Sequence, residues 1–237
     1  DAVVHFAGLK SVRESLIKNA EYYDVNVMGS NSLFEAMEEV MEKKILIFSS
    51  SACVYGDPNY LPIDEDHNLD PLNPYGLNKL EIENSLKKLY ESKKNWCVVC
   101  LRYFNPIGSE ESFLLGENPH KGSENLMPSL TKVAARKEKF LKVFGNDYET
   151  KDGTGVRDYI HVMDLVDGHI KALEILDEKE NFFDFINLGT GKGFTVLEII
   201  NSFEKVNKVK IRYKFFPRRK GDAQSSYANF SKAKKIL

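Results

Sequence analysis

Short apolar runs alternate with longer amphipathic stretches along most of the chain. Runs rich in branched and aromatic residues predict buried strands at residues 1–8, 45–48, 97–104 and 183–188. The longer stretches, whose apolar residues recur at helical spacing, predict helices at residues 21–40, 74–90, 165–176 and 196–205. Strands of about six residues that alternate with helices of ten or more are typical of a parallel α/β sheet.

The break at Pro106-Ile107-Gly108 predicts a boundary between two domains. We expect residues 1–106, joined by the returning segment 164–188, to form a Rossmann-like, doubly wound parallel sheet of the α/β class. Residues 107–163 and 189–237 are then a smaller α/β domain. Within it we expect a polar, glycine-rich loop or lid at 109–124, a helix that starts near Asn125 and a strand at 142–145.

The densest chemistry lies between residues 45 and 79. The predicted strand 45–48 runs into Ser49-Ser50-Ser51, and about twenty residues later Asn73 and Pro74 suit the N-cap and first position of a helix. Tyr75 and Lys79 are then i and i+4, so they share one face of that helix.

This arrangement favours a tyrosine base. Tyrosine, with a pKa near ~10, is a poor base at neutral pH. The Lys79 ammonium one turn away favours the Tyr75 phenolate, and a bound cationic cofactor ring would favour it further. A serine hydroxyl at the strand end could pass a proton between substrate and Tyr75.

The spacing alone is weak evidence, because Tyr90 and Lys94 repeat it. That copy lies in a charged helix end with no serine-tipped strand before it, so we interpret it as a solvated face. His5, His161 and Asp164 are interpreted as structural. For Asn26 two interpretations stay open, a cofactor contact and a satisfied polar core residue.

Ser51 with Tyr75-x-x-x-Lys79 resembles the Ser/Tyr/Lys set of the short-chain dehydrogenase/reductase superfamily, in its extended branch. The amino-acid sequence at residues 5–10, 48–52 and 101–106 is similar to that of the UDP-glucose 4-epimerase family. The similarity runs over essentially the whole chain. Residues 153–164 also match a long motif of the extended branch.

The resemblance implies an isomerase that uses tightly bound NAD to interconvert UDP-glucose and UDP-galactose, with Ser51, Tyr75 and Lys79 as catalytic residues. It assigns NAD contacts to Phe6, Ala7, Gly8, Lys10, Asn26, Ser49, Tyr75, Lys79 and Tyr103. It assigns nucleotide-sugar contacts to Ser51, Asn105, Asn125, Leu126, Lys142, Val143, Phe144, Arg157, Arg219, Asp222 and Ser226. It also implies a homodimer built through a four-helix bundle of the helices at 21–40 and 74–90, and no metal.

Two positions bear on the substrate. Relatives that catalyse elimination usually carry an acid just after the serine, whereas Ala52-Cys53 has no carboxylate, so those reactions are disfavoured. Ser226 occupies a place where the family has either a bulky tyrosine or a small residue, which predicts room for N-acetylated sugars. An epimerase for UDP-glucuronate or UDP-xylose, and a catalytically silent NAD-binding relative, remain alternatives.

Composition narrows the partners. Lys+Arg 33 against Asp+Glu 35 gives a net charge of −2, so no basic footprint for nucleic acid is present. No apolar run is long enough for a membrane span. Three cysteines, Cys53, Cys97 and Cys100, do not make a disulfide framework, and Cys97-x-x-Cys100 lies in a predicted buried strand. We expect a cytoplasmic protein.

The sequence has no Gly-x-Gly-x-x-Gly fingerprint. In the family that it resembles, the dinucleotide-binding domain begins about seventy residues earlier, with a glycine-rich loop at its first helix. We therefore expect the sequence to be a fragment without its first strands, and its last helix, 231–237, to be clipped as well.

Overall fold

A computed structural model describes residues 1–112, 114–117 and 125–237 of the chain. Its central feature is a four-stranded, fully parallel sheet in the order β1-β2-β3-β7. These strands are β1 (Val3–His5), β2 (Lys44–Ser51), β3 (Trp96–Tyr103) and β7 (Phe182–Leu188). The predicted α/β class and Rossmann-like sheet are therefore confirmed.

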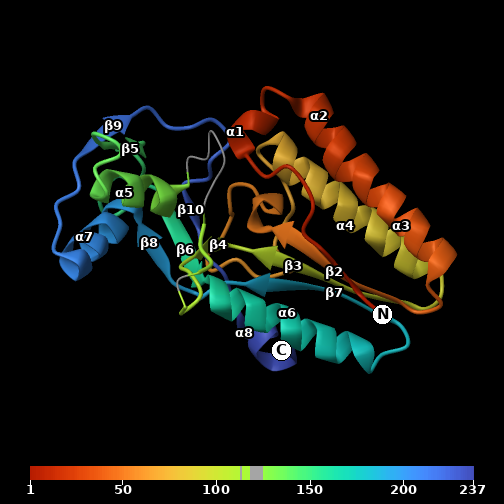
Figure 1. The fold of residues 1–237 in the computed structure, drawn as a ribbon. Helices are drawn as coiled ribbons and strands as arrows, with labels where there is room; N and C mark the ends of the chain where they lie inside the picture. The colour runs from red at the N-terminus through yellow and green to blue at the C-terminus, as the bar shows by residue number, and fades with distance from the viewer. Residues whose placement is uncertain (113, 118–124) are drawn as a thin grey trace.

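Helices cover both faces of this sheet (Figure 1). One face carries α2 (Asn19–Tyr23), a π-helical turn η1 (Asp24–Met28), α3 (Gly29–Val40) and α4 (Pro74–Ser92), with the short α1 (Val12–Ser15) before them. The other face carries α6 (Val162–Asp177) and α8 (Ser231–Ile236). The sheet is thus the middle layer of three.

Alternation along β2 explains the two layers. Leu46 and Phe48 pack with the buried side chains of α3 and α4, whereas Ile45 and Ile47 pack with those of α6. Successive residues of a strand point to opposite faces, so a strand covered on both sides is apolar at every position.

Some predicted boundaries were wrong. The predicted strand 45–48 continues to Ser51, because all three serines pair with β3. The single helix predicted at 21–40 is α2 and α3 joined by η1, with Asn26 in the π-helical turn. Helix α6 starts at Val162 rather than residue 165, because His161 Nδ1 accepts from the backbone N–H of Met163 and caps it.

The remainder of the chain forms a smaller α/β unit on the left of Figure 1. One sheet contains β4 (Asn105–Ile107), β6 (Val156–His161), β8 (Gly193–Thr195) and β10 (Ser225–Ser226), and a second pairs β5 (Leu141–Phe144) with β9 (Tyr213–Phe216). Helices α5 (Leu126–Ala134) and α7 (Val196–Asn207) pack on β5 around a separate apolar core. Because β4 pairs with β6, the chain enters this unit at Asn105.

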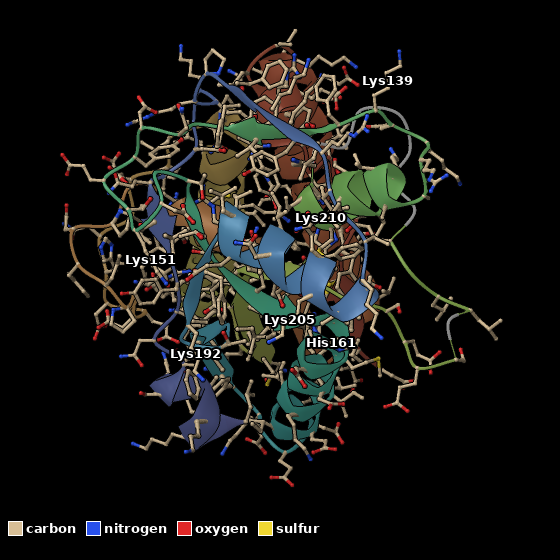
Figure 2. All side chains as sticks on the ribbon, turned by 90° about the vertical axis from the view of Figure 1, so that its left-hand side faces the viewer. Lys139, Lys151, His161, Lys192, Lys205 and Lys210 are labelled. Carbon is tan, nitrogen blue, oxygen red and sulfur yellow. The ribbon has the colours of Figure 1, made fainter. Side chains whose placement is uncertain are left out.

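The described lysines on the surface of the smaller unit are dispersed and do not form a single basic patch. Figure 2 shows Lys139, Lys151, Lys192, Lys205 and Lys210 spread over the face around α7. Lys151 pairs with Glu198 and Lys210 with Glu204.

The helices in the described part of the chain are too short or too polar to span a membrane. Part of the loop predicted at 109–124, residues 113 and 118–124, lies outside the described residues.

Candidate active site

The predicted catalytic residues meet at the carboxyl end of β2. Ser51 is the last residue of β2, 8% exposed, and Tyr75 lies in the first turn of α4. The Ser51 hydroxyl is within hydrogen-bonding reach of the Tyr75 hydroxyl and also accepts from the backbone N–H of Cys53 at 3.2 Å. The structure therefore joins two groups that are distant in sequence.

Local chemistry fixes the start of α4. Asn73 has extended backbone angles, and its side chain accepts from the Gly76 N–H at 2.9 Å, as an N-cap residue does. Pro74 supplies the first helical position. A Cβ on Gly76 would lie 2.7 Å from the carbonyl oxygen of Cys53, so glycine allows α4 to approach the strand end closely.

Burial works against ionisation of Tyr75. It raises the pKa of Tyr75 well above its ordinary value, with a further rise from Cys53, and the hydrogen bond with Ser51 only partly opposes these effects. Lys79 alone therefore does not turn Tyr75 into a phenolate. A further positive charge beside the phenol is needed to stabilise the phenolate. A bound cationic cofactor ring would supply that charge.

Lys79 lies deep beneath Tyr75. Its side chain is 6% exposed, and Nζ donates to the Ser49 carbonyl oxygen at 2.5 Å. Nζ is 4.7 Å from the centre of the Phe48 ring and 5.8 Å from that of Tyr75. Burial lowers the pKa of Lys79 to about 8, with an opposing contribution from the Glu83 carboxylate.

A loop after β1 forms the neighbouring part of the site. Gly8 has φ +154°, and a Cβ there would lie 2.9 Å from Asn26 Oδ1. Asn26 is 2% exposed, its Oδ1 accepts from Leu9 N at 2.7 Å and its Nδ2 donates to the Leu9 carbonyl at 3.0 Å. These bonds support the second interpretation of Asn26, a satisfied core residue that holds the loop.

This loop suits a dinucleotide. Phe6, Ala7 and Gly8 are exposed at the carboxyl end of β1, beside β2 and close to the ends of the parallel strands where such cofactors bind. The missing side chain at Gly8 makes room for the Asn26 amide, which holds the loop in place. Phe6, Ala7, Gly8 and Lys10 on this loop and Tyr103 on β3 fit a role in holding NAD, and Asn26 positions the loop through Leu9.

Tyr103 closes the site on the side of β3. It pairs in register with Ser51, and its hydroxyl interacts with the Ser49 side chain. Its hydroxyl also makes a short hydrogen bond to His169 Nε2, while His169 Nδ1 bonds to the Leu165 carbonyl. A carbonyl only accepts, so His169 donates through Nδ1 and Tyr103 donates to Nε2.

The predicted diphosphate residues gather beside β10, which is held in parallel register with β6. Arg157 donates to the carbonyls of Val156 and Ala223 at 2.7 and 2.8 Å, so its guanidinium holds the segment that leads into β10. Arg219 Nε donates to Asp222 Oδ2 at 2.8 Å, and Asp222 lies 4.0 Å from Arg157 Nη2. In this arrangement Arg157 is a positioning group rather than an open clamp.

The remaining predicted substrate residues are more dispersed. Val143 is 1% exposed within the core between β5 and the two helices, so its side chain does not offer a substrate contact. Lys142 lies over the Phe216 ring at 5.7 Å and Arg219 over the Phe144 ring at 5.0 Å. Asn105 is exposed at the start of β4, half-buried Leu126 begins α5, and Asn125 precedes it.

The chain matches a model of the NAD dependent epimerase/dehydratase family over residues 1–189. It is 50% identical over 237 residues to the UDP-glucose 4-epimerase of Bacillus subtilis, covering 100% of this chain and 69% of that protein. It is 52% identical over 235 residues to UDP-glucose 4-epimerase 4 of Oryza sativa, covering 99% of this chain and 63% of that protein.

Solved structures agree. The UDP-glucose 4-epimerase of Bifidobacterium longum, in complex with NAD+ and UDP, has a TM-score of 0.95 and 47% identity, covering 100% of this chain and 70% of that one. The UDP-Glc/GlcNAc 4-epimerase of Campylobacter jejuni has a TM-score of 0.80 and 37% identity, covering 100% of this chain and 70% of that one.

The chain belongs to the UDP-glucose 4-epimerases, within the NAD dependent epimerase/dehydratase family. It spans about two thirds of the length of the curated relatives that it matches. The resemblance inferred from Ser51, Tyr75 and Lys79 is therefore confirmed at the level of the family.

One buried pair near this site was not predicted from the sequence. Glu83 on α4 and Arg102 on β3 are each 1% exposed, and Arg102 Nη2 donates to Glu83 Oε2 at 2.7 Å. The available signal was a lone acid on the buried face of one predicted helix and a lone base in an otherwise apolar strand. A single charged residue in either element is common and does not by itself indicate a buried pair. Only the fold shows that these two residues face each other.

The structure also places His5, the second Tyr-x-x-x-Lys and the cysteines of β3. His5 is a core residue whose Nε2 bonds to the Ser30 hydroxyl at 2.8 Å, as expected. Tyr90 was interpreted wrongly as part of a solvated face, because its ring lies 5.4 Å from that of Phe183. Lys94 lies beyond the end of α4, so the second Tyr-x-x-x-Lys does not share a helical face. Cys97 and Cys100 are buried free thiols within β3.

The raised pKa of Tyr75 predicts its titration. In full-length protein without added cofactor, the phenol should stay protonated past pH ~10, the ordinary tyrosine value, because burial disfavours the phenolate. Carbon-13 NMR of labelled tyrosine measures this directly, with Tyr75→Phe assigning the resonance. Ionisation of Tyr75 below pH ~10 would contradict the prediction.

Proposed function

We propose that the full-length protein interconverts UDP-glucose and UDP-galactose by transient oxidation at C4 of the sugar, with NAD as resident cofactor. The observation that carries the proposal is the meeting of Ser51, Tyr75 and Lys79 at the carboxyl end of the parallel sheet. The named relatives at about half identity support the choice of substrate.

In the proposed reaction Tyr75 takes the proton of the sugar 4-hydroxyl, and Ser51 relays it over the short path between substrate and phenol. Lys79, charged below its pKa of about 8, stabilises the phenolate from one helical turn away. NAD, when bound, would accept the hydride from C4 and return it to the opposite face of the 4-keto sugar. The same Tyr75 then protonates the new 4-hydroxyl.

The two units of the fold divide the binding. We propose that residues 1–106 with 164–188 hold NAD and that 107–163 with 189–237 hold the UDP-sugar. Support comes from the exposed loop at Gly8 in the first unit and the Arg157, Arg219 and Asp222 cluster in the second. Asn105, Asn125, Leu126, Lys142 and Phe144 are proposed as further contacts of the second unit.

Assay of the full-length protein tests this function. Supplied with UDP-galactose, it should form UDP-glucose, followed by chromatography. Tyr75→Phe should lower kcat by about 10²- to 10⁴-fold, the usual contribution of an acid–base group, while UDP binding stays within about twofold. Tyr90→Phe, in the second Tyr-x-x-x-Lys, is the matched control and should keep its rate. A near-normal rate in Tyr75→Phe would remove that residue from its role.

The same assay separates the alternatives. Conversion of UDP-glucuronate or UDP-xylose in preference to UDP-galactose would assign the protein to another nucleotide-sugar epimerase. Bound NAD with no turnover on any of these sugars would point to a catalytically silent relative. The intact Ser51, Tyr75 and Lys79 argue against the silent relative.

Ser226 supports a wider substrate range. Its small, half-buried side chain lies in β10, opposite Arg157 in the ladder with β6. We propose that the space beside this small side chain lets the sugar site also admit UDP-N-acetylglucosamine and UDP-N-acetylgalactosamine. The Campylobacter jejuni neighbour, named for both Glc and GlcNAc substrates, shows that this range occurs on the fold.

A bulky residue should close that pocket. Ser226→Tyr should lower kcat/KM for UDP-N-acetylgalactosamine relative to UDP-galactose by roughly 10- to 200-fold, as steric changes in pockets do. Ser226→Ala keeps the space and should leave the ratio unchanged. Steady-state kinetics on both sugars measures the ratio, and an unaltered ratio in Ser226→Tyr would reject the pocket argument.

We propose that the protein is a homodimer through α2, η1, α3 and α4. Large apolar side chains on this surface are exposed: Tyr23 41%, Val25 45%, Met28 49% and Leu77 51%. Tyr23 also donates to Glu81 of α4 at 2.8 Å, so the helices present one continuous outer face. Exposed apolar surface of this kind is typical of an interface.

A charge on that face tests the dimer. Leu77→Glu should convert the full-length protein to monomer in sedimentation velocity, because a carboxylate in an apolar interface is unpaired. Val206→Glu places the same charge on α7, where the parent side chain is 75% exposed, and should leave the mass unchanged. A parent protein that sediments as a monomer would overturn the proposal.

We further propose a place in galactose metabolism in the cytoplasm. The free thiols of Cys53, Cys97 and Cys100 are consistent with a reducing compartment.

A further inference from the structure

A row of polar side chains crosses the sheet just below the active site. Ser50 pairs in register with Arg102, and Arg102 pairs with Asn187, so β2, β3 and β7 each contribute one member. All three are 1% exposed or less. They share the face on which α4 packs, because Phe48 and Cys100, two residues before Ser50 and Arg102, lie in the core beneath that helix.

Glu83 connects this row to α4. Its Oε1 accepts from the Ser50 hydroxyl at 2.6 Å and from Arg102 Nε at 3.0 Å, and its Oε2 accepts from Arg102 Nη2 at 2.7 Å. The remaining side of the guanidinium donates to Tyr55 at 2.9 Å, and Tyr55 donates to Asn187 at 2.7 Å. The carboxylate is thus held by two strands at once.

The same helix face carries the catalytic groups. Tyr75, Lys79 and Glu83 are spaced by four residues on α4, so they lie one turn apart on one side of the helix. A shift of Glu83 along the sheet would move Tyr75 relative to Ser51 by a similar distance, because the helix between them is continuous. The bonds from Ser50 and Arg102 oppose such a shift.

Glu83 also supplies charge. The titratable groups that act on Lys79 come from four elements: Glu83 and Tyr75 on α4, Cys100 on β3, Cys53 on η2 (Ala52–Val54) and His5 on β1. The cysteine thiols are buried with raised pKa values, and burial lowers the pKa of His5, so these groups are neutral near pH 7. Glu83 is therefore the anion that opposes the burial of the Lys79 ammonium.

Stability alone does not explain the pair. A buried ion pair of this kind is often no more stabilising than apolar residues of similar volume, because both charges lose their hydration. The bidentate geometry and the extra bonds to Ser50 and Tyr55 do make it geometrically specific. What the pair supplies beyond an apolar contact is a fixed position and a charge beside Lys79.

We propose that Glu83 is a positioning residue for the epimerase reaction proposed above: through Ser50 and Arg102 it fixes α4 over the carboxyl end of β2, and its carboxylate keeps Lys79 charged beside Tyr75. The inference rests on that proposed function for its kinetic consequence. Its electrostatic part concerns Lys79 alone and can be measured without turnover.

The test is the titration of Lys79 in full-length, carbon-13 lysine-labelled protein, with Lys79→Met assigning the resonance. In the parent we expect a pKa near 8. Glu83→Gln should lower it by roughly one pH unit, because the favourable anion is lost. In turnover of UDP-galactose, the alkaline limb of kcat/KM should move to lower pH by the same amount, with KM changed less than about twofold.

Two further variants separate position from charge, and a third replaces Glu83→Gln if that variant does not fold. Ser50→Ala removes one bond and keeps the ion pair, so kcat should fall about threefold with no change in the Lys79 titration. Leu86→Ala removes a buried side chain of α4 that lies 0% exposed, and should lower the melting temperature without moving either titration. If Glu83→Gln does not fold, Glu83→Gln with Arg102→Met removes both charges and should lower the Lys79 pKa in the same direction.

The outcomes are distinct. An unmoved Lys79 titration in Glu83→Gln, or an equal movement in Leu86→Ala, would reduce the pair to a structural element and overturn the inference. A lowered Lys79 pKa in a parent that does not convert UDP-galactose would uphold the electrostatic part and reject the proposed function instead. A parent that turns over, with a lowered Lys79 pKa and a shifted alkaline limb, supports both.

Discussion

The backbone of Gly76 lies directly against the carbonyl of Cys53, and the chemistry of this site depends on that approach. A side chain at residue 76 would meet the carbonyl oxygen at 2.7 Å, so α4 would have to withdraw from the end of β2. Withdrawal would part Tyr75 from Ser51, and it would pull Lys79 Nζ from its bond to the Ser49 carbonyl. The absence of a side chain at Gly76 therefore permits the observed placement of Ser51, Tyr75 and Lys79.

Much of this arrangement follows from short-range rules, and the rest does not. Asn73 and Pro74 correctly predicted the start of α4, because helix capping and the fixed φ of proline are properties of the local chain. Glu83 and Arg102 could not be paired in the same way, because their meeting depends on the register of β2 with β3 and the height of α4 above them. Similarly, the two hydrogen bonds between Asn26 and the Leu9 backbone depend on the packing of η1 against the loop after β1.

Burial raises the pKa of Tyr75 and lowers that of Lys79, and both changes favour the neutral form. It disfavours the phenolate of one and the ammonium of the other, so the pair in isolation tends towards two neutral groups. In that state Tyr75 can donate a proton, but as a neutral phenol it cannot act as the base. The Glu83 carboxylate favours the ammonium, and a cationic group beside the phenol would favour the phenolate, so the active charge state needs help from both sides.

The cluster of Arg157, Arg219 and Asp222 shows a similar balance of charge. Arg157 and Arg219 bring two positive charges to Asp222, and Arg157 already donates to backbone carbonyls beside β10. A diphosphate that entered there would compete with one carboxylate and with the three neutral carbonyls of Val156, Ala223 and Gln224, and its charge would favour it over the carbonyls. Ser226, which we propose faces the sugar, lies in the same short strand that Arg157 holds, so a change in the Arg157 contacts on binding would reach it. Diphosphate binding and sugar selection would then be linked through β10 rather than set by independent residues.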